Sequence, residues 1–278
     1  MNGLGNDFAI FDSRSRALQL GPEGAKRVAD REAGIGCDQV IVVEPSNQAD
    51  VFMRILNADG GEVDACGNAA RCVAAVIAQE LQKDQVSIET NVALLGAMQN
   101  EDGTITIDMG EPLFDWESIP LSEKFHDTRG IELAVGPVGN PVMHTPSVAN
   151  VGNPHCIFWV DNLADHDLAS IGPILEYHPF FPERANISLA QVNSRQSMDL
   201  IVWERGVGLT KACGTAACAA AVSAHRKRIC DRTVMVTLPG GTLRIDWRES
   251  DNHILMTGPI EYEYDGHLDP VDFAFQLA

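Results

Sequence analysis

The chain repeats itself at a fixed offset, and this repeat constrains its fold more than any other feature. Cys66 and Cys213 stand 147 positions apart, and each opens an alanine-rich run after an Ala-Cys-Gly triplet. Other matches at this offset need no gap: Gly5-Asn6 with Gly152-Asn153, Ile10-Phe11 with Ile157-Phe158, Gln39 with Asn186, Asn57 with Glu204, and Pro112 with Pro259. Chance similarity between alanine-rich helices would not align Asn, Phe and Pro. The repeat indicates an internal duplication and two homologous domains.

Short runs rich in β-branched and apolar residues predict strands, and alanine-rich runs predict helices. The expected strands are 9–12, 39–43, 52–56, 86–89 and 105–109 in the first half, and 156–160, 199–203, 234–238 and 254–257 in the second. The expected helices are 73–82 and 218–227. This pattern predicts an α+β, two-layer fold. We expect one domain over 1–110 and another over 111–258, with the tail 259–278 returning to the first domain as a strand.

Composition excludes several classes of partner. A formal charge of −19 disfavours nucleic acid, which needs a basic face. Apolar runs end well before 18 residues, so no membrane span is expected. The start has neither a basic segment nor an apolar one typical of a secretory signal, and seven cysteines in 278 residues suit free thiols. These features predict a cytoplasmic protein and leave the oligomeric state open, a homodimer included.

Each repeated cysteine stands where a polar loop passes into a helix. The unpaired N–H groups and the dipole at a helix start favour negative charge, which shifts a thiol towards thiolate. Gly67 and Gly214 leave the adjacent backbone open to a carboxylate, and Asn68 and Thr215 are predicted to cap the helices. Cys37, Cys72, Cys218 and Cys230 are interpreted as packing residues.

Two matched thiols suggest one chemistry. One thiolate can remove a proton from a carbon atom while the other thiol returns a proton to the opposite face, which inverts the stereocentre. A carbanion-like transition state would be stabilised by the two helix starts acting on the adjacent carboxylate. Cys66 and Cys213 are therefore the candidate catalytic pair of a two-base inversion.

Several motifs resemble the diaminopimelate epimerase family, in order and over nearly the whole chain. They are Gly-Leu-Gly-Asn-Asp-Phe (3–8), Gly-Ile-Gly-Cys-Asp-Gln (34–39), Asn-Ala-Asp-Gly (57–60), Cys-Gly-Asn-Ala-Ala-Arg-Cys (66–72), Gly-Asn-Pro-His (152–155), Trp-Glu-Arg-Gly-Val-Gly (203–208) and Ala-Cys-Gly-Thr (212–215). The resemblance implies interconversion of LL- and meso-diaminopimelate without cofactor or metal. It also implies that each domain is a mixed sheet curled around a central helix.

The resemblance further implies a set of site residues. Cys66 and Cys213 would be the acid/base thiols, and His155 a supporting polar group. The substrate contacts would be Asn6, Gln39, Asn57, Gly67, Asn68, Asn153, Asn186, Glu204, Arg205, Gly214 and Thr215. Neutral amides suit a substrate with ammonium and carboxylate groups, Glu204 suits an ammonium, and Arg205 can grip the distal carboxylate.

Five positions depart from the family pattern without removing a proposed catalytic group: Asn2, Cys37, Ala69, Ala216 and Leu209. They leave open a related amino-acid racemase or epimerase with another substrate.

A more distant alternative is a thiol protein that binds metal or undergoes redox chemistry. The cysteine spacings, Cys-x5-Cys at 66–72 and Cys-x4-Cys at 213–218, differ from the Cys-x2-Cys common in zinc sites.

Overall fold

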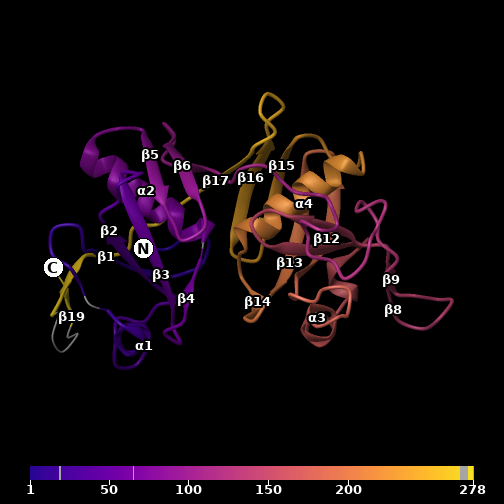
Figure 1. Cartoon of the computed structure of the whole chain (residues 1–278), viewed down its shortest axis with the longest axis horizontal. Helices are drawn as coiled ribbons and strands as arrows, with labels where there is room; N and C mark the ends of the chain where they lie inside the picture. Colours follow the sequence, from indigo (N-terminus) through magenta and orange to yellow (C-terminus); the bar gives the residue numbers. More distant parts are fainter. Residues whose placement is uncertain (19, 65, 270–274, 278) are drawn as a thin grey trace. The chain divides into compact units, whose positions relative to one another are not determined.

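The computed structural model describes residues 1–18, 20–64, 66–269 and 275–277. The chain divides into two compact units (Figure 1). Unit 1 comprises Met1–Asp108 and Thr257–Ala278, and unit 2 comprises Met109–Met256. We propose that these units are the two domains of the duplication. No helix among the described residues is both long and apolar enough to span a membrane.

Unit 1 packs two helices against a mixed sheet. Its strands are β1 (Phe8–Asp12), β2 (Gln39–Glu44), β3 (Val51–Asn57), β4 (Glu62–Val63), β5 (Gln85–Glu89), β6 (Leu94–Gln99) and β7 (Ile105–Asp108), and its helices are α1 (Pro22–Ala29) and α2 (Gly67–Leu81). The sheet order is β1-β2-β3-β5-β6-β7, with β4 paired to β3. The β1–β2 and β3–β5 pairs are parallel. Helix α2 contacts β5, β6 and β7, and α1 contacts β2 and β3 (Figure 1).

Unit 2 repeats this arrangement with additions. Its strands are β8 (Ala134–Val135), β9 (Met143–His144), β10 (Ser147–Asn150), β11 (Pro154–Trp159), β12 (Asn186–Ser194), β13 (Ser197–Glu204), β14 (Gly208–Thr210), β15 (Thr233–Leu238) and β16 (Gly241–Trp247). Its helices are the 3-10 turn η1 (Leu163–Asp165), α3 (Leu168–Glu176) and α4 (Gly214–Arg226). The sheet order is β16-β15-β13-β12-β11-β10, and β17 (Ile254–Gly258) leads the chain back to unit 1.

The duplication is visible in the strand register. Phe8 pairs with Gln39 between β1 and β2, and the residues 147 positions later, His155 and Asn186, pair between β11 and β12. The same shift carries α1 onto α3 and α2 onto α4. Strands β8, β9 and β10 precede the part of unit 2 that has a counterpart in unit 1. The predicted α+β, two-layer class with an internal duplication is therefore confirmed.

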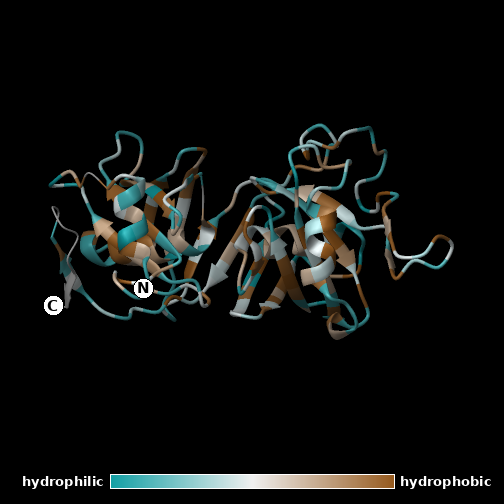
Figure 2. Cartoon of the chain, turned by 90° about the horizontal axis from the view of Figure 1, so that it is seen from below, coloured by the Kyte–Doolittle hydropathy of each residue, from teal (hydrophilic) through white to brown (hydrophobic). Residues whose placement is uncertain are grey.

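The two central helices are built mainly from small residues. In α4, Ala216, Ala217, Ala219 and Ala220 are all fully buried, and α2 buries Ala69, Ala70 and Ala74 in the same way. Methyl side chains let strands approach a helix from several directions, so the sheet can curl around it. Figure 2 shows hydrophobic residues concentrated on the strands of each unit and mainly hydrophilic loops.

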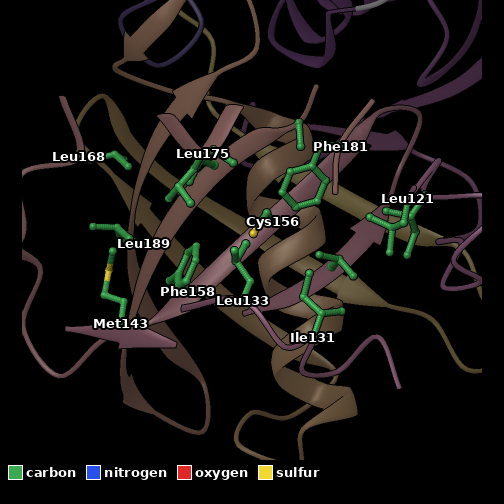
Figure 3. Packing of buried hydrophobic residues seen from close by; sticks show 14 residues of the cluster. Leu121, Ile131, Leu133, Met143, Cys156, Phe158, Leu168, Leu175, Phe181 and Leu189 are labelled. Atoms are coloured by element: carbon green, nitrogen blue, oxygen red, sulfur yellow. The ribbon is translucent and has the colours of Figure 1, made fainter. Parts of the chain in front are cut away.

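Part of the interior of unit 2 forms a hydrophobic cluster that includes no residue of α4. Cys156, Phe158 and Leu133 converge on it, together with Leu175 of α3 and Phe181 (Figure 3). All five side chains are buried. Cys156 therefore serves as a small apolar residue, and burial raises the pKa of its thiol far above the ordinary value. A second cluster in unit 1 joins α1 to β1, β2 and β3.

The nine strands expected from the sequence all occur, as β1, β2, β3, β5, β7, β11, β13, β15 and β17, but the strands between them were not predicted and the starts of both central helices were misplaced. Helix α2 begins at Gly67, six residues before the predicted start at Val73, and α4 begins at Gly214, four residues before the predicted start at Cys218. The short helices α1 and α3 were not predicted. Asn68 and Thr215 do not cap their helices, because both lie inside them, and the N-cap residues are Cys66 and Cys213.

The tail differs from its expected form. Strands β18 (Gly266–Leu268) and β19 (Phe275–Leu277) pair with each other as a separate two-stranded sheet. The tail still joins unit 1 through a bridge between Asn2 and Glu261 and through Leu268, which packs against the cluster beside α1. Residues 270–274 and 278 of the predicted returning segment lie outside the described residues.

Candidate active site

The two repeated cysteines occupy equivalent positions in the two units. Cys66 is the N-cap of α2, with φ −147° and ψ 109°, and Cys213 is the N-cap of α4, with φ −132° and ψ 108°. The chain is extended at each cysteine and helical from the next residue, a glycine. Each sulfur therefore stands beside the first backbone N–H groups of a helix, which have no partner within that helix. The duplicated sequence builds the same thiol position twice.

Cys213 is buried and surrounded by polar groups. Its Sγ lies 3.4 Å from Thr215 Oγ1 and shares a hydrogen bond with Glu204. Burial is the main reason that the pKa of this thiol is raised well above its ordinary value, and the charge of Glu204 adds to the effect. Thr215 and the backbone N–H of Ala216 act in the opposite direction. The predicted shift towards thiolate is thus wrong for Cys213 in this state, because desolvation outweighs the helix start.

Glu204 lies at the end of β13 and has its own support. Thr210 Oγ1 donates a hydrogen bond of 2.5 Å to Glu204 Oε1, across the antiparallel β13–β14 pair. Burial raises the pKa of Glu204, while the hydrogen bonds from Thr210 and Cys213 lower it. Glu204 was among the predicted substrate contacts, whereas Thr210 was not. The pairing of β13 with β14 is what brings the two side chains together.

Cys66 is half-buried, and its helix start carries a chain of polar side chains. Asn68, on the first turn of α2, is buried and donates from Nδ2 to Asn6 Oδ1 at 3.4 Å. Arg71, one turn further along α2, donates from Nη2 to Asn68 Oδ1 at 3.1 Å. These two hydrogen bonds place Asn6, one of the predicted substrate contacts, beside the start of α2, which carries Cys66.

Asn6 is also held from the other side. Its Nδ2 donates to Asp38 Oδ2 at 2.9 Å, and the backbone N–H of Asp7 donates to the same oxygen at 2.9 Å. Arg31 forms ion pairs with both carboxylates, at 3.0 Å to Asp7 and 2.8 Å to Asp38. Asn2, one of the positions that depart from the family pattern, donates to Asp7 and accepts from the Gly5 N–H. Neither Asp38, which lies within the motif 34–39, nor Arg31 was among the predicted site residues.

Gln39 and Asn57 lie opposite each other on β2 and β3. Gln39 Nε2 donates to Asn57 Oδ1 at 2.9 Å. Gln39 Oε1 is buried and has no hydrogen-bond partner among the described residues. A buried carbonyl oxygen without a donor is costly, so this atom is suited to accept a hydrogen bond from a ligand.

In unit 2, Asn186 connects two of the other predicted site segments. Its Nδ2 donates to the Pro154 carbonyl at 3.0 Å, and its Oδ1 accepts the Arg205 backbone N–H at 3.0 Å. The Arg205 guanidinium donates to the Glu183 carbonyl at 3.1 Å. The structure therefore joins Asn186 to Arg205. The grip of Arg205 on a distal carboxylate stays a prediction.

His155 supports Asn153 from within the core. Its Nε2 lies 2.7 Å from Asn153 Oδ1, and its ring is fully buried. Burial, with a smaller contribution from Arg205, lowers the pKa of His155 to about 3, so the imidazole is neutral at ordinary pH. The neutral ring can hold the amide without adding charge.

The residues that depart from the family pattern are accommodated. Ala69 and Ala216 lie two positions after Gly67 and Gly214, the first residues of their helices, and are fully buried, and Leu209 is exposed. Cys37 is buried, which raises the pKa of its thiol to about 11. No group of three or more His, Cys, Asp or Glu side chains suited to a metal ion occurs among the described residues.

Comparison of the sequence with known proteins gives relatives that share one name. A relative from Brucella anthropi named diaminopimelate epimerase is 53% identical over 274 residues, which cover 97% of this chain and 90% of the relative. A relative of the same name from Rhodopseudomonas palustris is 50% identical over 280 residues, covering 100% and 94%. The model of the diaminopimelate epimerase family matches residues 1–114 and 147–263. The chain belongs to the diaminopimelate epimerase family.

Solved structures extend the likeness of fold beyond the diaminopimelate epimerase family. A Bacillus anthracis phenazine biosynthesis protein of the PhzF family has a TM-score of 0.61 at 19% identity, covering 93% of this chain and 92% of that one. An Agrobacterium vitis hydroxyproline epimerase with bound trans-4-hydroxy-L-proline has a TM-score of 0.60 at 14% identity, covering 88% and 79%. At these identities the likeness shows the shared fold alone.

Proposed function

We propose that this chain is an isomerase that interconverts LL- and meso-diaminopimelate, with Cys66 and Cys213 as the two acid/base groups and no cofactor. The observation that carries the proposal is the matched placement of these two thiols. Each is the N-cap of a central helix, with nearly the same backbone angles, in a chain from this family. The reaction belongs to lysine biosynthesis, and we place the protein in the cytoplasm, where that biosynthesis takes place.

The reaction needs one proton removed and one delivered. In one direction the thiolate of Cys66 takes the α-proton and becomes a thiol, and the electron pair stays on the α-carbon and its carboxylate. The thiol of Cys213 then gives its proton to the opposite face of the carbon and becomes the thiolate. The configuration is inverted, and the reverse reaction exchanges the two roles.

The surroundings of Cys213 support its role as the proton donor in this direction. Burial and the charge of Glu204 keep its thiol protonated until substrate arrives. Glu204 is also placed to receive the α-ammonium of an amino acid. A bound ammonium would neutralise the charge that opposes ionisation of Cys213, so binding would favour release of its proton.

The helix starts supply the stabilisation of negative charge. The N–H groups of Gly67 and Asn68, and those of Gly214 and Thr215, are oriented by the first turns of α2 and α4. They suit the α-carboxylate, whose charge grows when the α-proton leaves. Gln39, Asn57, Asn186 and Arg205 supply the polar groups that a second amino-acid end requires.

A combined exchange and inversion assay tests the proposal. Purified protein is incubated with LL-diaminopimelate in deuterated water. The products are separated by chiral chromatography, and their deuterium content is measured by mass spectrometry. We expect meso-diaminopimelate with one deuterium at the inverted carbon, and loss of inversion by at least 1,000-fold (roughly 4 kcal/mol) in Cys66→Ala and Cys213→Ala. Cys72→Ala and Cys218→Ala are matched controls, since these cysteines lie within the same helices.

Two outcomes would contradict the proposal. Retained inversion in either Cys66→Ala or Cys213→Ala would remove the two-base assignment. Faster turnover of another amino acid in a substrate panel that includes proline, hydroxyproline, lysine and glutamate would assign the chain to a related racemase or epimerase.

A further inference from the structure

Two asparagines that correspond in the duplication are held in opposite ways. Asn6 and Asn153 stand 147 positions apart, one before β1 and the other before β11, and both are partly exposed. Asn6 is held by its Nδ2 group, which donates to Asp38 Oδ2 at 2.9 Å. Asn153 is held by its Oδ1 atom, which lies 2.7 Å from His155 Nε2.

The chemistry of Asp38 fixes the orientation of Asn6. A carboxylate only accepts hydrogen bonds, so the amide must turn its NH2 group towards Asp38. Burial opposes ionisation of Asp38, but the N–H groups of Asp7 and Asn6 and the charge of Arg31 outweigh it and hold its pKa below the ordinary value. Asn6 Oδ1 is therefore turned away from Asp38. Its remaining contact, with Asn68 Nδ2, is long at 3.4 Å.

The chemistry of His155 fixes Asn153 in the reverse sense. Nδ1 of the buried ring has no hydrogen-bond partner among the described residues. A buried N–H without an acceptor is costlier than a bare ring nitrogen in the same place, so the proton resides on Nε2 and is donated to Asn153 Oδ1. Nδ2 of Asn153 then has no partner among the described residues and is available as a donor.

Each of the two holding residues occurs in one domain only. At the position that corresponds to Asp38, unit 2 has Ala185, which is fully buried and cannot accept a hydrogen bond from Asn153. At the position that corresponds to His155, unit 1 has Phe8, which is buried and cannot donate to Asn6. Each domain thus keeps the asparagine but supports it from the other side.

We propose that Asp38 and His155 are positioning residues that give the matched asparagines opposite hydrogen-bonding polarity, so that Asn6 presents a carbonyl oxygen to an ammonium group of the substrate and Asn153 presents an N–H to a carboxylate. This inference deepens the proposed function and rests on it. A substrate with amino-acid ends offers one group of each kind at each end. Two asparagines of equal polarity would bind two ammonium groups or two carboxylates and would discriminate less between the ends.

A reciprocal exchange tests the assignment of Asn6. In Asn6→Asp two carboxylates face each other, and in Asp38→Asn the orientation of Asn6 is lost, so each single change should lower kcat/KM about tenfold to a hundredfold, chiefly through KM. In the double variant Asn6→Asp/Asp38→Asn the amide of residue 38 donates to residue 6, which still presents an acceptor, but the Asp7 N–H loses the oxygen that it shares with Asn6. We therefore expect partial rescue, with kcat/KM at least about threefold above that of the better single variant.

The same reasoning predicts no rescue at the second asparagine. Asn153→Asp replaces the presented N–H by a carboxylate oxygen, and no change at position 155 restores a donor. Asn153→Asp and Asn153→Asp/His155→Gln should both stay at least tenfold lower in kcat/KM. The matched control is Asn162→Asp, because Asn162 donates to Asp165 at 3.0 Å at the surface of unit 2, and it should leave kcat/KM unchanged.

A measurement without substrate separates this inference from the proposed function. Nitrogen-15 NMR of histidine-labelled protein reports which ring nitrogen carries the proton, and we expect His155 to be protonated at Nε2. Protonation at Nδ1, or a double variant at 6 and 38 that folds but is no better than the single variants, would overturn the inference. If His155 is protonated at Nε2 but diaminopimelate is not a substrate, the proposed function fails and the orientation of Asn153 stands.

Discussion

Glu176 supports the segment 203–206, which carries Glu204 and Arg205, and replacing its carboxylate should lower the stability of the protein measurably. The side chain is buried at the end of α3, with 2% of its surface exposed. Its Oε2 accepts the Trp203 Nε1–H at 2.7 Å, and its Oε1 accepts the Gly206 backbone N–H at 2.9 Å. One carboxylate therefore ties both ends of the segment 203–206.

The expected cost follows from these contacts. In Glu176→Gln the amide keeps one acceptor oxygen, so one of the two N–H groups loses its partner, at about 1.5–3 kcal/mol. In Glu176→Ala both lose it, at about 3–5 kcal/mol. Arg184 lies 3.8 Å from Glu176 and is about half exposed, so this ion pair adds less than about 1 kcal/mol. The midpoint of thermal unfolding should fall by roughly 3–12 °C in Glu176→Gln.

Calorimetry of the whole protein and steady-state kinetics check this reasoning. The matched control is Glu183→Gln, because that side chain is exposed and should change stability by no more than about 0.5 kcal/mol. We also expect a higher KM for diaminopimelate in Glu176→Gln, since the segment that carries Glu204 and Arg205 loses one of its ties. Equal unfolding temperatures for Glu176→Gln and Glu183→Gln would refute the proposed role of Glu176.

Three further predictions concern pH and packing. Thr210→Val should shift the acidic limb of the kcat/KM–pH profile to higher pH, because a hydrogen bond that lowers the pKa of Glu204 is lost. An unchanged acidic limb would contradict this role of Thr210. The pKa of His155 is about 3 in the folded protein and near 6.5 in the unfolded chain. As the pH falls from 6.5 to 3, the unfolded chain is protonated at this residue while the folded protein is not. The free energy of unfolding should therefore fall over this range, by up to roughly 5 kcal/mol. Urea unfolding should show a smaller loss in His155→Phe. Gly172→Ala should cost about 1–3 kcal/mol in the same assay, because a Cβ would lie 2.6 Å from the Trp203 ring.

Much of the fold could be predicted because the strands are short, apolar and repeated. Helix α3 was missed for a physical reason. Gly172 and Pro173 lie inside it, and both disfavour helix in isolation. The helix forms because Asp167 caps its start and because Gly172 allows the Trp203 ring to pack closely. The start of α2 was missed since no side chain of the usual capping type hydrogen-bonds there.

Some residues of the candidate site could be predicted from the sequence and others could not. Residues inside recognisable motifs, such as Cys66 and Gln39, could be found from the sequence alone. Thr210 and Glu176 could not, and the role of Asp38 could not although it lies within a motif, because these roles depend on strand pairing or on contacts between segments far apart in the chain. The predicted thiolate at Cys213 failed because the sequence does not reveal how deeply that sulfur is buried.

The alanine content of α2 and α4 has a consequence for the energetics of the site. An alanine side chain has no rotamers to lose, so ordering these helices costs little side-chain entropy on folding. Each cysteine is thus attached to a segment whose side chains have few alternative arrangements. A ligand that binds at the helix starts finds its N–H donors already ordered, and little of its binding free energy is spent on arranging them.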